Sequence, residues 1–441
     1  MLLTSNSFLF LFLPFSLMIN FFNIDRKIKT IFLGVVSGYF YFIDNGYLLV
    51  ILIFLSILMR YQIQNHSINN FIFISLLLSP LFVFKYSFVF FKLFQIDVPV
   101  YIQNNFPIGL SFFTFQAIAY YFDKERLRGE EDSFEIFTFL TFFPQLLAGP
   151  IVDIATYRKG VSNTSTSYDF FLEGTYRISI GLLKKFFVAD TLSQVTLIYT
   201  ESLFGFNFSY LSSAILILSY TFQIYFDFSA YCDIAIGIAL LFGFKLPENF
   251  NKPYLSSSFQ EFWRRWHITL SNFFKNFIYI PLGGNRVSRI KHYRNLWITF
   301  LLTALWHGAT FNFILWGILH GFFLTFEKLI NFNKLFSNKL VTFMLISLTW
   351  VPFFSLNFGD TINILSSLFV LDTSSDTFLP ILFQYINFKF LIVSIICALS
   401  LLNIKIKSKF RNNILFTVPL FVLSIFIVLS SSVDPFIYFR F

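Results

Sequence analysis

The sequence predicts an all-α polytopic membrane protein, with about ten to twelve transmembrane helices and some short re-entrant or interfacial helices. Of its 441 residues, 56% are hydrophobic and only 12% are charged. A soluble domain carries roughly 25% charged residues, so half that fraction cannot solvate the surface of a water-soluble protein of this size. The apolar residues also gather in long charge-free runs, and a helix needs roughly 20 such residues to cross a bilayer.

These runs give the expected elements in chain order. The runs without Asp, Glu, Lys or Arg are Met1–Ile24, Tyr61–Phe84, Val98–Phe122, Ile136–Val152, Ser202–Phe226, Asn295–Phe326, Leu340–Gly359, Phe390–Ile404 and Asn412–Val433. Ile31–Met59 is interrupted only by Asp44, and Phe170–Val188 and Ala230–Phe244 carry a few charges. We expect residues 1–441 to form one transmembrane domain.

The ends of the chain predict its orientation. Met1–Ile24 does not resemble a signal peptide, because no basic residue precedes it and no small-x-small cleavage site follows. Arg26, Lys27 and Lys29 follow this run, so the positive-inside rule places the N-terminus outside and this cluster in the cytoplasm. The same rule places the C-terminus outside, because a basic cluster precedes the last run. This cluster is Lys405, Lys407, Lys409 and Arg411.

The net charge of +9 does not indicate a nucleic-acid partner. The basic residues fall between apolar runs, as the positive-inside rule requires. Cys232 and Cys397 are far apart and form no CxxC motif, so they predict neither a disulfide framework nor a metal site. The chain has no P-loop, dinucleotide fingerprint, Gly-x-Ser-x-Gly elbow or His-Glu-x-x-His motif. Its sparse acidic residues argue against a proton-driven transporter.

The longest polar stretch, 245–294, has the composition of helices that lie in the membrane interface. Aromatic and basic side chains alternate in it, and Ile280–Arg286 adds a tight turn. Such a surface suits a phosphorylated ligand, but it equally suits anionic lipid headgroups. Lys184 and Lys185 form a smaller patch with the same two interpretations. The basic residues of the stretch include Arg264, Arg265, Lys275, Arg286, Arg289, Lys291 and Arg294.

Two of the five histidines lie within the charge-free run 295–326. An ionisable group at membrane depth is a functional hypothesis, against the alternative of a neutral histidine hydrogen-bonded between helices. His307 is the better candidate for chemistry, because Gly308 leaves room for another chain or a ligand. His320 shares a helix face with Asn312 and Trp316, which predicts a packed polar seam. The polar connections carrying His66 and His292 predict solvated side chains.

His267 lies in the aromatic and basic sequence 262–271. On a helix, Trp263 and His267 share a face, and Glu261 can pair with Arg265. Spacing alone favours an amphipathic interfacial helix with His267 at its polar edge over a functional histidine.

Several motifs, in order along the chain, resemble those of the membrane-bound O-acyltransferase family, in its bacterial alginate O-acetyltransferase branch. The matching segments are Phe8–Pro14, Pro107–Gln116, Phe143–Pro150, Tyr225–Tyr231, Asn249–Tyr254, Phe262–Ser271, Tyr279–Arg286, Leu305–Gly308 and Phe436–Phe441. The resemblance covers nearly the whole chain. It implies the fold of that family and transfer of acyl groups to hydroxyls across a membrane.

The resemblance also implies roles for particular residues. The family's essential histidine corresponds to His307, and its second histidine to His267, where Thr269 replaces the usual serine. His307 is expected to act as the neutral base that accepts the hydroxyl proton, while His267 orients a reactant or stabilises developing charge. No metal and no bound cofactor are expected. Residues expected to contact the donor or substrate are Arg264, Arg265, Lys275, Arg286, Trp306 and Asn312.

The implied donor is acetyl-CoA from the cytoplasm, and the implied acceptor is an exported polysaccharide such as alginate, cellulose, another exopolysaccharide or peptidoglycan. A periplasmic esterase-like partner would pass the acetyl group on. This places the chain in the bacterial cytoplasmic (inner) membrane, in contact with lipid and not with nucleic acid. A D-alanyl transferase for teichoic acids remains an alternative, as do a polysaccharide or lipid transporter and a structural scaffold of a secretion complex. The turn at Tyr279–Arg286 favours the O-acetyl branch.

Overall fold

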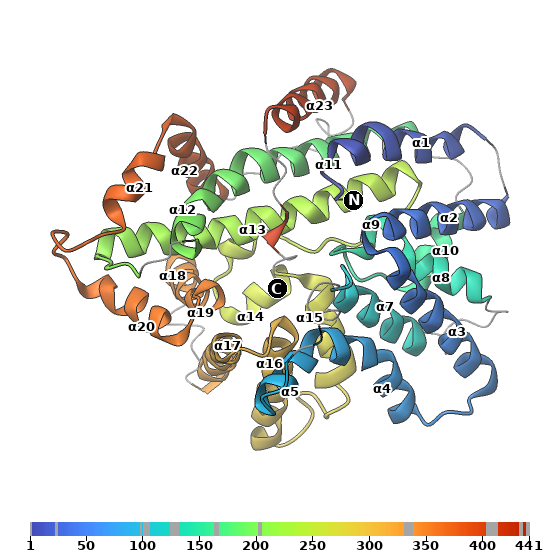
Figure 1. The fold of residues 1–441 in the computed structure, drawn as a ribbon, viewed down its shortest axis with the longest axis horizontal. Helices are drawn as coiled ribbons and strands as arrows, with labels where there is room; N and C mark the ends of the chain where they lie inside the picture. Colours follow the sequence, from blue (N-terminus) through green and yellow to red (C-terminus); the bar gives the residue numbers. More distant parts are fainter. Residues whose placement is uncertain are drawn as a thin grey trace. The chain divides into compact units, whose positions relative to one another are not determined.

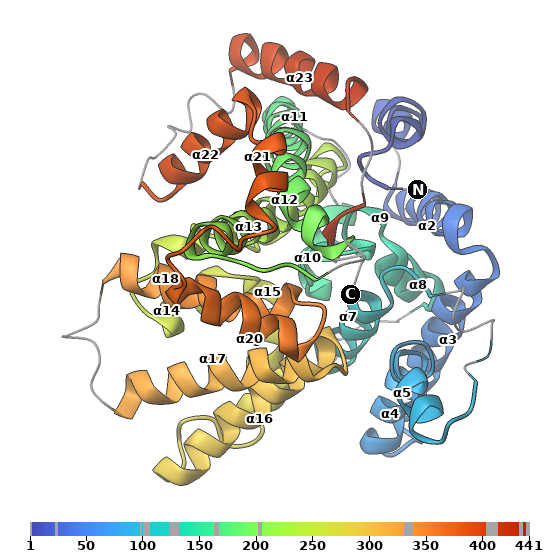
Figure 2. The same ribbon diagram turned by 60° about the vertical axis from the view of Figure 1, so that its left-hand side comes forward.

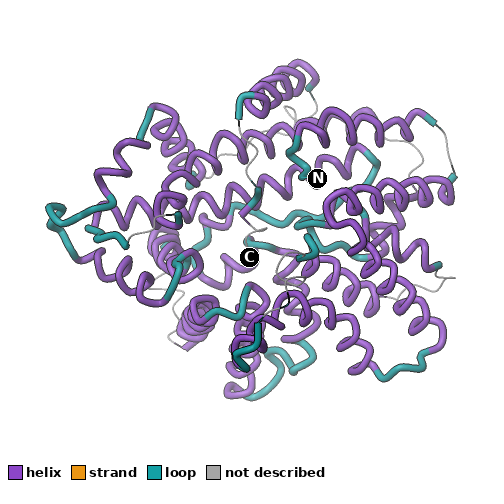
Figure 3. Tube along the Cα trace, in the orientation of Figure 1, coloured by secondary structure: helices purple, strands orange, loops and turns teal. Residues whose placement is uncertain are grey.

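The computed structural model describes residues 2–22, 25–97, 99, 106–123, 132–162, 167–201, 205–329, 338–402, 413–431 and 435–437. Every regular element in these ranges is a helix (Figure 1, Figure 3), as the composition predicts. The expected basic cluster 405–411 before the last helix lies outside the described residues, so the orientation of the C-terminus stays a prediction.

The chain divides into two compact units. Unit 1 comprises Met1–Leu182, Tyr231–Glu248 and Lys407–Phe439, and unit 2 comprises Leu183–Ala230, Asn249–Ile406 and Arg440–Phe441. The longest helix, α13 (Tyr210–Leu241), contributes residues to both units. The expectation of one transmembrane domain stays a prediction, and both histidine motifs belong to unit 2.

Unit 1 holds the N-terminal helices and the last one. They are α1 (Leu13–Leu17), α2 (Arg26–Asn45), α3 (Leu49–Asn65), α4 (Asn70–Leu81), α5 (Ser87–Leu93), α7 (Leu110–Asp123), α8 (Ser133–Thr141), α9 (Phe143–Leu146), α10 (Ile154–Ser162), α11 (Tyr168–Leu182) and α23 (Ile414–Leu429). Within the expected cytoplasmic cluster of Arg26, Lys27 and Lys29, the last residue has a structural role. Its side chain is buried, and its Nζ donates to the carbonyl oxygens of Gly160 and Phe242 at 3.2 and 3.1 Å.

Unit 2 holds the remaining helices. They are the π-helices η6 (Leu183–Ala189) and η8 (Lys275–Tyr279), the 3-10 helices η7 (Pro253–Leu255) and η9 (Ser367–Phe369), and the α-helices α12 (Asp190–Thr200), α14 (Phe259–Arg265), α15 (Ile268–Phe274), α16 (Arg289–His307), α17 (Phe311–Leu329), α18 (Lys339–Thr349), α19 (Val351–Phe354), α20 (Phe358–Ser366), α21 (Leu379–Tyr385) and α22 (Phe388–Ser400). The expected interfacial stretch 245–294 is thus made of short helical segments, η7, α14, α15 and η8, followed by the start of α16.

Three stretches in the described part of the chain are long and apolar enough to cross a membrane. They are Arg26–Asn65, Asn70–Lys92 and Tyr210–Leu241. A fourth candidate is the pair α21 and α22, which is bent by 95°. The run Tyr61–Phe84 is not one helix, because His66 takes a left-handed conformation and Asn69 caps the start of α4. Many of the predicted spans are therefore shorter or broken helices.

The run Asn295–Phe326 forms a helical hairpin rather than one helix, because α16 ends at His307 and α17 begins at Phe311. In two views α16 and α17 lie side by side (Figure 1, Figure 2). They approach closely at Gly317, where an added Cβ would lie 2.6 Å from the Cβ of Ala304. Gly308 does not leave room for a ligand, because the ring of Phe313 occupies the space beside it.

Candidate functional site

His267 lies between two short helices rather than on one continuous helix. Helix α14 ends at Arg265, and His267 has a φ of +41° before α15 begins at Ile268. Trp263 and His267 therefore do not share a helix face, and the expected amphipathic helix with a solvated histidine is wrong. His267 is 1% exposed. The predicted pair of Glu261 and Arg265 is confirmed at 2.6 Å.

Asn249 orients the His267 ring. The Asn249 Oδ1 atom accepts hydrogen bonds from the backbone N–H and the hydroxyl of Thr269, at 3.0 and 2.9 Å. It lies 3.3 Å from His267 Nδ1. Because this oxygen can only accept, Nδ1 carries the proton and Nε2 carries the lone pair. Burial lowers the pKa of His267 to about 3, so the imidazole is neutral near pH 7.

His307 ends α16 inside an aromatic cage and is 6% exposed. The rings around it belong to Trp306, Phe313, Trp316 and Phe353. The Trp306 ring also approaches His267, with ring centroids 6.3 Å apart. The structure thus brings the two candidate histidines next to the same indole.

His320 occupies the predicted polar seam. The Trp263 indole N–H donates to its Nδ1 at 3.2 Å, so its Nε2 carries the proton and donates to the Thr349 hydroxyl at 3.1 Å. That hydroxyl donates in turn to the carbonyl of Ile346. Both ring nitrogens therefore hold helices together, and His320 fixes the orientation of Trp263.

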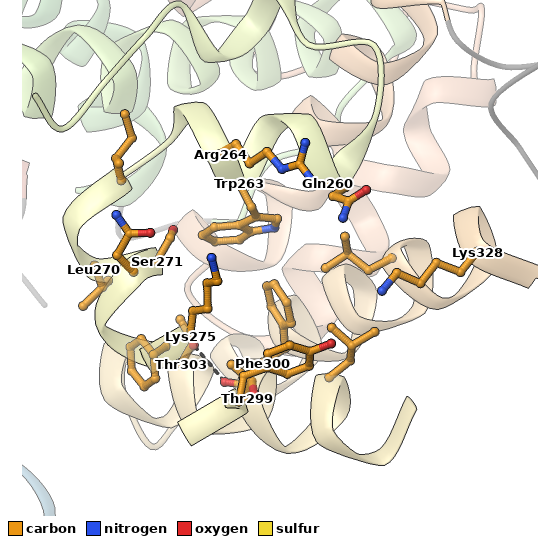
Figure 4. Close-up of a pocket in the computed structure, with 16 residues that line it drawn as sticks. Gln260, Trp263, Arg264, Leu270, Ser271, Lys275, Thr299, Phe300, Thr303 and Lys328 are labelled. Carbon is orange, nitrogen blue, oxygen red and sulfur yellow. Dashed lines mark hydrogen bonds between the residues drawn. The ribbon is translucent and has the colours of Figure 1, made fainter. Parts of the chain in front are cut away.

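A cavity of about 320 Å³ lies between the α14–α15 segment and the α16–α17 hairpin. Trp263, Phe300 and Leu324 give it apolar walls. Figure 4 shows the ammonium groups of Lys275 and Lys328 directed into it from different elements.

A second, more polar recess of about 630 Å³ shares Gln260, Lys275, Tyr279 and Lys328 with this cavity. Arg289, His292 and Asn285 complete its polar lining. His292 is not simply solvated as predicted, because its ring nitrogens lie 3.1 Å from the Tyr279 hydroxyl and 2.7 Å from Lys328 Nζ. No carboxylate is among the residues lining the recess, so it suits an anionic group such as a phosphate.

One face of α16 connects the cavity with His307. Thr299 and Thr303 line the cavity, and His307 follows them at the same four-residue spacing. Residues four apart lie above one another on a helix, so this face leads from the cavity toward the imidazole. An elongated molecule with an anionic end and a slender apolar end fits this arrangement.

The predicted contact residues separate into groups. Arg264 and Lys275 line the cavity, whereas Arg265 is paired with Glu261 and Arg286 is an exposed residue of the confirmed turn. The Trp306 ring contacts the rings of both His267 and His307. Asn312 is 7% exposed and donates to the Ser355 carbonyl at 2.8 Å.

The structure does not support the interpretation of Lys184 and Lys185 as a surface that binds a ligand. Lys185 is 2% exposed and forms ion pairs with Asp227 at 2.9 Å and Asp190 at 2.8 Å. The nearby Lys184 donates to the Ser229 hydroxyl at 3.3 Å. These two lysines therefore stabilise the packing of η6 against α13 rather than presenting charge to a ligand.

Sequence reasoning missed Asn249 and Lys328 as members of the site. Asn249 belongs to a quoted motif but is 18 residues from His267, so only the fold brings them together. Lys328 lies in the last turn of α17, beside His292 near the start of α16. In the described part of the chain, no three His, Cys, Asp or Glu side chains are grouped closely enough to hold a metal ion.

Comparison with known proteins adds independent information. The model of the family described as MBOAT, membrane-bound O-acyltransferase, matches residues 57–369. A probable alginate O-acetylase, AlgI, of Pseudomonas aeruginosa is 42% identical over 255 residues, which are 56% of this chain and 48% of the relative. A peptidoglycan O-acetyltransferase of Helicobacter pylori is 39% identical over 304 residues, covering 59% of this chain and 56% of the relative.

A teichoic acid D-alanyltransferase of Bacillus subtilis is more distant, at 27% identity over 270 residues. That alignment covers 55% of this chain and 65% of the relative. The chain spans about half the length of the alginate and peptidoglycan relatives that it matches. The family match includes α13, both histidine motifs and the residues that line the cavity.

Proposed function

Because this chain belongs to the membrane-bound O-acyltransferase family, we propose that it transfers an acetyl group from acetyl-CoA for O-acetylation of an exported polysaccharide or peptidoglycan. The observation that carries the proposal is the line of Thr299, Thr303 and His307, which leads from a cationic cavity to a buried imidazole. The relatives named as O-acetylating proteins are 39–42% identical, which supports an acetyl donor.

The donor binds with its phosphates in the polar recess and its thioester end in the apolar cavity. Lys275 and Lys328 border both spaces and supply positive charge where the phosphates lie. The pantetheine arm passes between Trp263 and Phe300, and the acetyl group reaches His307. Acetyl-CoA is a co-substrate here, and the reaction needs no resident cofactor.

The imidazole of His307 accepts the proton of the acceptor hydroxyl as its oxygen attacks the thioester carbonyl. The new C–O bond forms, the C–S bond breaks, and the CoA thiolate leaves with the proton from His307. His267, held by Asn249 with Nε2 as its lone-pair nitrogen and lying beside Trp306, orients a reactant or the leaving group. Each step uses groups that this chain or its substrates supply.

We further propose that the protein lies in the bacterial inner membrane with both termini outside the cytoplasm. It passes acetyl groups to an esterase-like periplasmic protein, which acetylates alginate, cellulose, another exopolysaccharide or peptidoglycan. The apolar helices and the basic residues Arg26 and Lys27 support this orientation.

D-alanyl transfer is a second candidate, favoured by the relatives named teichoic acid D-alanyltransferase. Purified protein should release CoA from acetyl-CoA in the presence of acceptor but should not consume a D-alanyl thioester of a carrier protein. The opposite preference would support the second candidate. Flux of glycan or lipid across proteoliposomes without acetyl transfer would instead support a transporter.

Substitution of His307 tests the proposed reaction. His307→Ala should lower radiolabelled acetyl transfer at least about 1,000-fold, since it removes the general base. The His66→Asn variant is the control, because His66 is exposed and asparagine tolerates its left-handed backbone. Both variants should elute from gel filtration in detergent as the wild-type protein does. Full activity of His307→Ala would overturn the proposal.

A further inference from the structure

Helix α17 carries two buried polar atoms that the packing of the protein does not explain. Trp316 is fully buried, and its indole Nε1–H finds no hydrogen-bond partner among the residues that the structure describes. One turn earlier, Asn312 Oδ1 is likewise without a partner in the described chain. Buried polar groups are nearly always hydrogen-bonded, so such an unpaired donor and acceptor on one helix face require an explanation.

Both atoms lie on the helix that packs beside His307. The Trp316 ring meets the His307 ring edge to face, with centroids 5.1 Å apart. The amide nitrogen of Asn312 is already engaged with the Ser355 carbonyl at 2.8 Å, which fixes the side chain and leaves its oxygen on the other side. A hydrogen-bond donor on Trp316 and an acceptor on Asn312 therefore lie on the helix that packs beside the His307 imidazole.

The position of Trp316 also relates it to the cavity. Trp263 lines the cavity, and its ring centroid lies 5.8 Å from that of Trp316. The other indole of this pair has a partner, because Trp263 donates to His320. The Trp316 ring therefore contacts both a ring that lines the cavity and the ring of His307.

We propose that the Trp316 N–H is the donor that stabilises the oxyanion formed on the acyl carbonyl during transfer. The inference rests on the proposed function. When the hydroxyl oxygen bonds to the carbonyl carbon, the electron pair of the C=O bond moves to oxygen, and His307 takes the hydroxyl proton. The indole N–H donates to that negative oxygen until the C=O bond reforms and the C–S bond breaks. Asn312 Oδ1 accepts from a polar hydrogen of the same bound substrates.

A fixed, water-excluded donor has the physical properties that this role needs. The helical hairpin and the surrounding rings hold the indole before the reaction begins, so no reorganisation accompanies charge development. A donor with no competing acceptor is fully available to the oxyanion. The Trp263 indole differs in this respect, because its N–H already donates to His320.

The test is a Trp316→Phe substitution, which removes the N–H and keeps an aromatic ring. Steady-state kinetics with acetyl-CoA should show kcat falling about 100-fold with KM changed less than about threefold, since oxyanion donors act mainly in the transition state. Trp350→Phe is the matched control. Trp350 is equally buried, and its ring stacks on that of Trp316 with centroids 6.0 Å apart.

The outcomes separate this inference from the proposed function. If Trp316→Phe and Trp350→Phe lose activity equally, packing explains the loss and the oxyanion role is wrong. Wild-type kcat in Trp316→Phe, with His307→Ala inactive, also overturns the inference and leaves the proposed function standing. Active His307→Ala overturns both. A thermal-unfolding midpoint for Trp316→Phe close to that of Trp350→Phe, together with a selective fall in kcat, supports the inference.

Discussion

At the scale of single residues, Asn249 determines how His267 can act. Its side-chain oxygen accepts from Thr269 twice and from His267 once, so one amide fixes both the turn and the tautomer. A buried acceptor with this many partners is costly to remove, because the donors left behind lose water and protein partners together.

We therefore expect Asn249→Leu to lower acetyl transfer about 10- to 100-fold, since it leaves the His267 ring without its orienting partner. It should also lower the free energy of unfolding by about 1–3 kcal/mol, because the Thr269 N–H stays buried. Asn249→Asp keeps an acceptor oxygen and should retain more activity. Equal activity of Asn249→Leu and the wild-type protein would show that His267 needs no orientation from Asn249.

The buried His267 also predicts acid sensitivity. Its pKa of about 3 lies below the unfolded value near 6.5, so the unfolded chain binds the proton more tightly. Stability is therefore lost as pH falls below about 6.5, by about 2 kcal/mol at pH 5. His267→Gln should lose less thermal stability than the wild type between pH 7 and pH 5 in detergent. An identical loss in both proteins would contradict the burial of a neutral imidazole.

Residue chemistry was predictable where a motif is local and not where it depends on the fold. The sequence allowed the prediction of the pair Glu261 and Arg265 and of the seam at His320. The catalytic role of His307 stays a prediction. It could not reveal Asn249, because contact between residues 18 apart depends on the left-handed turn at His267.

At the scale of elements, the α16–α17 hairpin positions the site. Its helices approach closely where Gly317 faces Ala304 and the carbonyl of Phe300, the latter 3.0 Å from an added Cβ. This contact holds the face of Thr303 and His307 in register with the face that carries Trp316. The hairpin is therefore the element most sensitive to added volume.

Substituting two glycines of α17 tests this contact. Gly317→Ala should be less stable than Gly321→Ala by about 1–3 kcal/mol, because its Cβ would lie 2.6 Å from Ala304 whereas that of Gly321→Ala meets Trp297 at 3.4 Å. Both changes gain the same helix propensity, so the difference reports packing. Thermal unfolding in detergent measures it, and equal midpoints would mean that the hairpin is loosely packed.

Hydropathy predicted where helices occur but not where they break. The run Asn295–Phe326 carries no charge across Gly308, and Tyr61–Phe84 carries none across His66. The breaks arise from backbone conformation and capping, at the left-handed His66 and at the Asn69 cap. Apolar composition is insensitive to both, so continuous apolar runs predict longer helices than the chain forms.

At the scale of the whole molecule, charged residues are scarce, and the basic ones serve two different purposes. Lys29 and Lys185 are buried and hold helices together. Lys275, Arg289 and Lys328 instead surround an open recess. The composition of 12% charged residues identifies a membrane protein, but only the fold separates structural cations from those available to a ligand.

This division predicts different effects of two lysine substitutions. Lys275→Gln should raise the KM for acetyl-CoA about 10-fold, because it removes one charge-assisted contact with phosphate. Lys339→Gln, at an exposed position at the start of α18, should leave KM unchanged. Raising the ionic strength should increase the KM of the wild-type protein more than that of Lys275→Gln. Equal KM values for both variants would exclude Lys275 from the donor site.

The most direct test of the account is an experimental structure with a non-hydrolysable acetyl-CoA analogue. We expect density for the analogue in the cavity between α14–α15 and the α16–α17 hairpin. Its phosphates should lie near Lys275 and Lys328, and its acyl end should lie against His307. An analogue bound elsewhere, with the cavity empty and its acyl end away from His307, would contradict the proposed route of the acetyl group.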